Sequence, residues 1–176
     1  MSATRLLVLG VVRMHGRAHG YLVGSELESW EAERWAGLRS GSIYHALRQL
    51  AKEGLLDVGE VHEWPGRVDY AINDKGEAEF LRLLRAALSV PDRRPELLSA
   101  ALVMLPALPD EEVITLLGKR AHALEEERAR IVATAREGER PRHVAELFAW
   151  RAAQAAGDAA WTHDLIGRLE RGERPA

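Results

Sequence analysis

The sequence has 176 residues, a formal net charge of −3 and no cysteine. Without cysteine the chain can form no disulfide, thiolate metal site or cysteine nucleophile. No apolar run reaches the roughly 20 residues that span a bilayer, and the N-terminal residues lack the basic region and cleavage site of a signal peptide. We therefore expect a cytoplasmic protein with no membrane partner, built as one domain or as a small domain with an extension.

Overall charge does not point to a nucleic-acid partner. Residues 1–90 contain 11 Lys and Arg against 12 Asp and Glu. A DNA-binding function would therefore need a local group of basic side chains, and dimerisation and DNA shape would carry more of the affinity.

Two helices are predicted before residue 40. Residues 4–14 are nearly all apolar and predict a buried helix with Thr4 as its N-cap. Residues 15–20 predict a turn, whose two glycines argue against a metal pair of His15 and His19. A second helix is predicted over residues 21–33, with Val23, Leu27 and Trp30 facing inward.

The most informative stretch covers residues 40–54. Ile43, Leu47 and Leu50 recur at the spacing of one helical face, while His45, Arg48 and Lys52 fall on the opposite face. Ser40 is the expected N-cap, and Gly54 is expected just past the helix end. A recognition helix that enters a DNA major groove has this design. The alternative is an ordinary amphipathic helix with a solvated polar face.

A β-hairpin is predicted next, because residues 55–64 and 67–72 alternate apolar and polar positions around the turn dipeptide Pro65-Gly66. A further helix is predicted over residues 73–88. Three helices, a hairpin and a helix make a winged helix, with Arg67 near the wing tip.

Residues 5–85 resemble the PadR-type winged-helix transcriptional regulators. The matching pieces, in order, are the Leu-rich N-terminal helix, His19-Gly20-Tyr21, Ser42-Ile43-Tyr44-His45-Ala46-Leu47, Leu50-Ala51-Lys52-Glu53-Gly54-Leu55-Leu56, Tyr70-Ala71-Ile72, and the helix led by Asp74-Lys75-Gly76. The sequence departs from the family at His45, where Pro is common, and in a wing with Arg67 as its single basic residue. These departures leave the fold expectation unchanged and the operator sequence open.

The second half predicts a helical pair. Pro91–Pro95 is the expected boundary between a winged-helix domain at 1–90 and a helical domain at 91–176. A short helix is expected over 96–105, and long antiparallel helices over about 110–135 and 143–169. The stripe of the last helix includes Leu147, Trp150, Trp161 and Leu165. Small residues on the adjoining face would let another helix approach closely, and they are Ala152, Ala156 and Ala160. This segment resembles the C-terminal helical dimerisation region of the PadR branch with a long tail.

The fold class expected is mainly α with a small β-hairpin: an N-terminal winged helix-turn-helix and a C-terminal antiparallel helical dimerisation region. Trp150 and Trp161 are predicted either as dimer-core anchors or as the walls of an effector pocket, with Gln154 or Asp158 as its polar group. No catalytic motif is recognisable, so no enzyme, cofactor or metal site is expected.

The predicted function is a homodimeric DNA-binding regulator, a repressor that a small molecule or another signal releases from an inverted-repeat operator in double-stranded DNA. His45, Arg48 and Gln49 are the candidates for base contacts, and Arg67 for a contact beside or in the minor groove. Candidates for phosphate contacts, which the resemblance also implies for the tyrosines, are Tyr21, Ser40, Ser42, Tyr44 and Lys52. Two alternatives stay open: a winged-helix protein-interaction module that does not bind DNA, and a sensor with a pH or metal input through His15, His19 or His122.

Overall fold

The computed structural model describes residues 2–62, 67–137 and 140–173. They divide into two compact units. The first runs to Ala87 and includes Asp92–Leu105, and the second comprises Leu88–Pro91 and the chain from Pro106 onward. Within the described parts of the chain, no helix is both long and apolar enough to cross a membrane.

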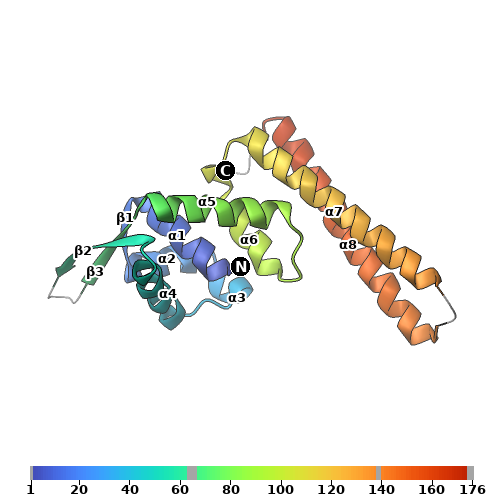
Figure 1. Ribbon diagram of the computed structural model, residues 1–176, viewed down its shortest axis with the longest axis horizontal. Helices are drawn as coiled ribbons and strands as arrows, with labels where there is room; N and C mark the ends of the chain where they lie inside the picture. Colours follow the sequence, from blue (N-terminus) through green and yellow to red (C-terminus); the bar gives the residue numbers. More distant parts are fainter. Residues whose placement is uncertain (1, 63–66, 138–139, 174–176) are drawn as a thin grey trace. The chain divides into compact units, whose positions relative to one another are not determined.

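The first unit combines helices with a three-stranded antiparallel sheet (Figure 1). The last two residues of its fifth helix belong to the second unit. The elements in chain order are α1 (Ala3–His15), β1 (Arg17–His19), α2 (Gly20–Ser29), α3 (Ala32–Ala36), α4 (Ser40–Lys52), β2 (Leu56–His62), β3 (Arg67–Ile72), α5 (Asp74–Ser89) and α6 (Pro95–Val103).

The core of this unit is built around α1. Its residues from Leu6 to Val12 are fully buried, as is Phe80 of α5. A Cβ on Gly10 would lie 2.4 Å from Met104 Sδ and 3.1 Å from the Phe80 ring, so this glycine lets α1 pack closely on both neighbours. The helix starts one residue before the predicted Thr4, with Ser2 rather than Thr4 at its N-cap position.

The sheet has the strand order β1-β3-β2. The hairpin of β2 and β3 is confirmed, with Leu56 opposite Ile72 and Val61 opposite Val68, and its register shifts between Val58 and Val61. The predicted turn at Pro65-Gly66 lies outside the described residues. Strand β1 was expected to be part of a turn. Its three residues pair with β3 across 50 or more residues of sequence, so no local pattern marks them.

The predicted single helix over residues 21–33 is wrong in its second half. Helix α2 ends at Ser29, and Glu31 adopts a left-handed backbone (φ 52°) before the short α3 begins. The Trp35 indole donates a hydrogen bond to the Trp30 carbonyl oxygen at 2.7 Å, which stabilises the break. Trp30 is accordingly half-buried at the break, while Val23 and Leu27 are buried as predicted.

The second unit contains two long helices, α7 (Asp110–Arg136) and α8 (Arg142–Glu170), as the sequence predicts (Figure 1). A 3₁₀ turn, η1 (Leu105–Ala107), precedes them, and its first residue belongs to the first unit. The apolar stripe predicted for α8 divides between two environments in the single chain. Leu165 is buried, but Leu147 and Trp150 are exposed, and Trp161 is 39% exposed. The buried face of α8 consists of Ala155, Ala159, Thr162, Leu165 and Leu169. Ala155 and Ala159 give the two backbones a close approach, and Leu165 and Leu169 fill the contact further along the helix, while Leu147 and Trp150 lie outside it.

Candidate nucleic-acid interface

Helix α4 is capped at both ends. It begins at Ser40, and Arg39 rather than the predicted Ser40 is the N-cap residue. The Ser42 hydroxyl accepts a hydrogen bond from the Arg39 backbone N–H at 3.1 Å and donates one to the Arg39 carbonyl oxygen at 2.6 Å. At the other end Gly54 has φ +72°, the left-handed conformation expected just past a helix.

The two faces of α4 separate as predicted. Ile43, Leu47 and Leu50 are buried, with at most 5% of their surface exposed. The side chains of the opposite face are exposed and polar, and two of them are cationic. They are His45, Arg48, Gln49 and Lys52.

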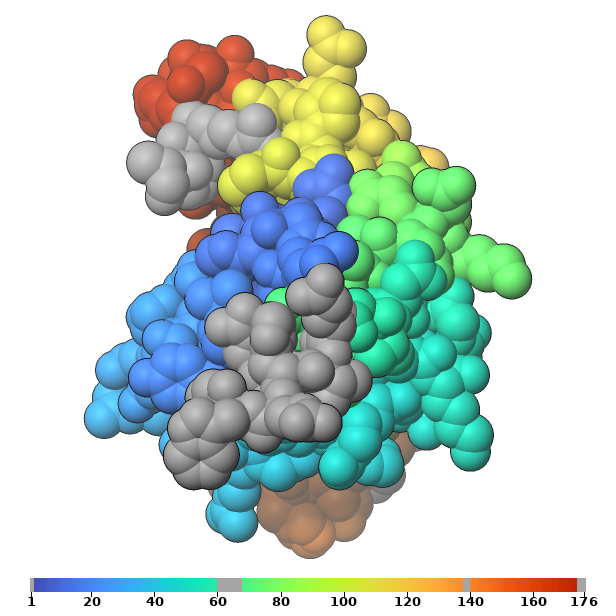
Figure 2. All heavy atoms as spheres, turned by 90° about the vertical axis from the view of Figure 1, so that its left-hand side faces the viewer, coloured from blue at the N-terminus to red at the C-terminus, as the bar shows by residue number. Residues whose placement is uncertain are grey.

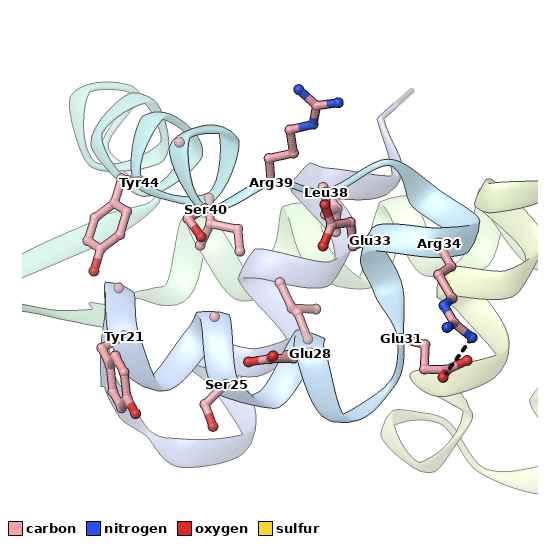
Figure 3. Close-up of a pocket in the computed structure, with 15 residues that line it drawn as sticks. Tyr21, Ser25, Glu28, Glu31, Glu33, Arg34, Leu38, Arg39, Ser40 and Tyr44 are labelled. Carbon is pink, nitrogen blue, oxygen red and sulfur yellow. Dashed lines mark hydrogen bonds and ion pairs between the residues drawn. The ribbon is translucent and has the colours of Figure 1, made fainter.

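A cleft of about 710 Å³ lies between α2, α3 and the start of α4 (Figure 3). Tyr21 of α2 and Tyr44 of α4 face each other at one end, and both are exposed, by 76% and 47%. Ser25 and Ser40 add hydroxyl groups to the lining, so this end offers donors from two helices. Figure 2 shows one face of the first unit on which the segments of α2–α3 (lighter blue) and α4–β2 (blue-green) both reach the surface.

Gly20 is the residue that allows Tyr44 to lie against the start of α2. A Cβ at position 20 would lie 2.1 Å from Tyr44 Cε1. The preceding His19 is the N-cap of α2, and its Nδ1 accepts a hydrogen bond from the Leu22 backbone N–H at 3.2 Å. The tyrosine ring is thus placed beside a helix N-terminus, the end of a helix that favours anions.

Three glutamates and two arginines, Arg34 and Arg39, line the rest of the cleft. Glu28, Glu31 and Glu33 line it, and Glu31 pairs with Arg34 at 3.2 Å (Figure 3). Carboxylates repel phosphate, so the tyrosine end of the cleft suits an anion better than the part where the glutamates outnumber the arginines.

The last turn of α4 carries a hydrogen-bonded chain. Gln49 Nε2 donates to Glu53 Oε1 at 2.8 Å, and Arg5 Nη1 lies 2.5 Å from Glu53 Oε2. Arg5 Nε also donates to Glu79 Oε1 at 3.2 Å. The hydrogen bond from Gln49 and then that from Arg5 hold the pKa of Glu53 below its ordinary value. Glu79 likewise has a lowered pKa, chiefly through its hydrogen bond from Arg82.

Arg67 is the first residue of β3 and pairs with His62 in the register of the wing. Its place at the outer end of the hairpin agrees with the predicted wing position. The base- and phosphate-contact assignments themselves remain predictions.

The four C-terminal candidates share one exposed face of α8. Trp150 is 59% exposed and Trp161 39%, and Gln154 and Asp158 between them are exposed. A separate cavity of about 200 Å³ opens between α7 and α8, and neither tryptophan lines it.

The histidines of the alternative sensor hypothesis have other neighbours. His15 Nε2 lies 3.5 Å from Glu26, His122 Nε2 lies 3.5 Å from Glu126, and His19 caps α2. Over the described ranges, no three His, Asp or Glu side chains are grouped so that they could hold a metal ion.

Sequence reasoning missed three contributors to this surface. Arg39 and Ser25 line the cleft, and Gly20 fits under Tyr44. Arg39 directly precedes the predicted helix and could have been recognised as its flanking cation. The roles of Ser25 and Gly20 depend on packing between α2 and α4, which has no local signal.

Helices α1, α2 and α4, the exposed polar face of α4 and the antiparallel wing of β2 and β3 together define the winged helix-turn-helix class. Residues 8–82 match the model of the transcriptional regulator PadR-like family. The resemblance read from the sequence is confirmed over residues 8–82, which form a PadR-like winged-helix domain. A search of curated protein sequences finds no match.

Several solved structures are similar over nearly the whole chain. Bacillus subtilis PadR in complex with operator DNA is 16% identical, with 94% of this chain and 98% of that chain covered and a TM-score of 0.41. The complex of the same protein with p-coumaric acid is 15% identical, with 96% of each chain covered and a TM-score of 0.41. The PadR-like regulator BC1756 from Bacillus cereus is 21% identical, with 97% and 99% covered and a TM-score of 0.39.

Proposed function

We propose that this protein is a homodimeric DNA-binding transcriptional repressor that a small molecule or another signal releases from its operator. The observation that carries the proposal is the outer face of α4, which is capped, exposed and polar beside the tyrosine end of the cleft. A helix of this kind fits the B-DNA major groove, about 12 Å wide.

Each part of the surface has a distinct role in this proposal. His45, Arg48 and Gln49 contact base edges in the groove. Arg67 on the wing binds beside or in the minor groove. The residues proposed to contact phosphates are Tyr21, Ser40, Ser42, Tyr44 and Lys52.

The dimer contact is assigned to the exposed apolar face of α8. Leu147, Trp150 and Trp161 together present large apolar side chains on a helix that already covers α7 with another face. Exposed aromatic side chains gathered on one face are typical of protein–protein contacts. A two-fold dimer then requires an inverted-repeat operator, with half-sites about one helical turn apart or a multiple of that.

Release follows from a difference in affinity between two dimer geometries. A ligand that binds more tightly when the recognition helices are wrongly spaced lowers the population that fits the operator. Gln154 and Asp158 lie between the tryptophans and would be the polar groups of such a site.

The test is a gel-shift titration with the DNA upstream of the protein's own coding region, over protein and salt concentration. We expect a specific, salt-sensitive complex with two subunits per site. Arg48→Ala should weaken it while the dimer persists in light scattering. An unchanged affinity of this variant would remove Arg48 from the interface.

A protein-interaction module is the second candidate. The acidic part of the cleft, together with the slight excess of acidic over basic residues in 1–90, favours it. A salt titration of binding to random duplex DNA separates the two, because only a phosphate-contacting protein loses affinity steeply with salt. No DNA complex at any salt concentration, from a folded dimer, would put the interaction module first.

A further inference from the structure

The carboxamide of Gln49 has a defined orientation. An amide side chain can be turned by 180° at almost no cost when nothing distinguishes its oxygen from its nitrogen. Here Glu53 Oε1 lies 2.8 Å from the Gln49 amide nitrogen. An ionised carboxylate only accepts hydrogen bonds, so the NH₂ group must face it and the carbonyl oxygen must lie on the other side.

The carboxylate that fixes this amide is itself held in place. Arg5 of α1 lies 2.5 Å from the other oxygen of Glu53 and also bonds Glu79 of α5. The lowered pKa of Glu53 keeps it ionised at neutral pH. Turning the Gln49 amide over would place two acceptor oxygens against each other, which costs a hydrogen bond and adds repulsion.

We infer that Glu53 is a positioning residue for sequence readout, which makes Gln49 present its carbonyl oxygen as a hydrogen-bond acceptor to the base that it meets. This inference rests on the proposed function, since it concerns a helix placed in the major groove. Glu53 need not touch DNA for this role.

The chemistry of the base edges gives the consequence. In the major groove, adenine and cytosine offer an amino donor, while guanine and thymine present a carbonyl oxygen at the corresponding place. An amide with its oxygen outward and one N–H already engaged suits adenine or cytosine. Guanine, whose N7 and O6 both need donors, is disfavoured.

A purely structural role for Glu53 is the competing explanation, because it also links α4 to α1. Glu79 supplies the matched control. It binds the same arginine and is also a glutamate with a lowered pKa, but it accepts its hydrogen bonds from Arg5 and Arg82. Glu79→Gln therefore disturbs the hydrogen bonds of Arg5, while Gln49 can still donate to the carboxylate of Glu53.

The experiment measures base preference at every operator position, by binding selection from a randomised pool with the full-length protein. The variants are E53Q, E79Q, Q49A and the double variant Q49A/E53Q. Q49A should lose base preference at one operator position, and wild type should prefer adenine or cytosine at that position. E53Q should reduce that preference by about fivefold or more, the discrimination that one good base contact provides. E79Q should leave it unchanged, and E53Q should have no further effect in the Q49A background.

The outcomes separate this inference from the proposed function. If wild type binds specifically but E53Q has the same base preferences, the inference alone is overturned. The same holds if E53Q loses preference uniformly at all operator positions. Absence of any specific DNA binding by the folded wild type overturns the proposed function, and the inference with it.

A second measurement does not depend on DNA and covers the case in which E53Q folds poorly. In the NMR spectrum of the free wild-type protein, the Gln49 side-chain NH₂ signals should shift on acidification below pH 4.5 as Glu53 becomes protonated, and not between pH 5 and 7. A side-chain signal that is insensitive to this titration would overturn the inference.

Discussion

At position 20 a single hydrogen in place of a methyl group decides where the Tyr44 ring can lie, because a Cβ there would be 2.1 Å from the ring. We expect Gly20→Ala to push the tyrosine out of the cleft. If Tyr44 contacts a phosphate as proposed, operator affinity should fall about tenfold, the loss of one hydrogen bond to a charged group.

The matched control is Gly24→Ala in the same helix, where an added Cβ meets nothing within 4 Å. Gel-shift titration of both variants checks the prediction, with thermal melting to show that both remain folded. Equal affinities of the two variants would mean that the position of Tyr44 does not matter for binding.

Gly76, in the first turn of α5, has a different kind of neighbour. A Cβ at this position would lie 2.1 Å from the Leu55 carbonyl oxygen, which belongs to the backbone and cannot rotate away. Gly76→Ala should therefore destabilise the fold by about 2 kcal/mol or more, although alanine is the better helix former. Urea unfolding measures the change in the free energy of unfolding. A variant as stable as wild type would show that the backbone at Leu55, between α4 and β2, can shift to make room for the added methyl group.

At the scale of elements, the contact between α7 and α8 depends on small side chains. Ala155 and Ala159 are buried at 6% exposure, whereas Ala153 of the same helix is exposed. Ala159→Leu should force the pair apart and cost about 1–3 kcal/mol of stability, whereas Ala153→Leu should change it by less than about 0.5 kcal/mol. Chemical denaturation followed by circular dichroism distinguishes them.

The ion pairs that join α1 to α4 and α5 give the first unit a dependence on pH. Glu53 and Glu79 both have pKa values lowered from 4.5. Their stabilisation is therefore complete above about pH 4.5 and is lost as the pH falls through the lower pKa of the folded state. The free energy of unfolding should decrease from pH 5 to pH 3, and E79Q should show a shallower decrease. Identical slopes would mean that Glu79 does not contribute.

Elements were the level at which the sequence was most informative. The buried stripe Ile43, Leu47 and Leu50 and the alternation of the hairpin are periodic, so they predicted α4 and the wing, and the long helices ended within a few residues of their predicted bounds. Strand β1 and the break at Glu31 depend on contacts formed elsewhere in the chain. The apolar stripe of α8 did not indicate which of its side chains pack on α7, because close packing of two helices selects small residues such as Ala155 and Ala159.

The site was predictable as residue types on a helix face, but its arrangement was not. That His45, Arg48 and Lys52 face away from the core follows from the periodicity alone. Two parts of the site depend on how side chains meet in three dimensions, which residue spacing along the chain does not specify. They are the cleft between Tyr21 and Tyr44 and the carboxylate that orients the Gln49 amide.

At the scale of the whole molecule, the proposal requires two copies of the chain. Trp150→Glu places a charge in the exposed apolar face of α8 and should convert the dimer to monomers, with at least a tenfold loss of operator affinity. Ala153→Glu, exposed outside that face, should keep the dimer. Sedimentation velocity gives the oligomeric state directly. A dimeric Trp150→Glu protein would place the subunit contact elsewhere.

The carboxylates along the far part of the cleft have a consequence for how such a regulator would find its target on a chromosome. Glu28, Glu31 and Glu33 face the same space as the tyrosines. A docking pose that brought a phosphate against them would be penalised on operator and random DNA alike, so complexes held by phosphate contacts alone would be weak and short-lived. Search would then proceed by short encounters from free solution rather than by long one-dimensional sliding. The pool of regulator not bound to the operator would remain mostly dissolved, where a signal could reach it without competing with bulk DNA.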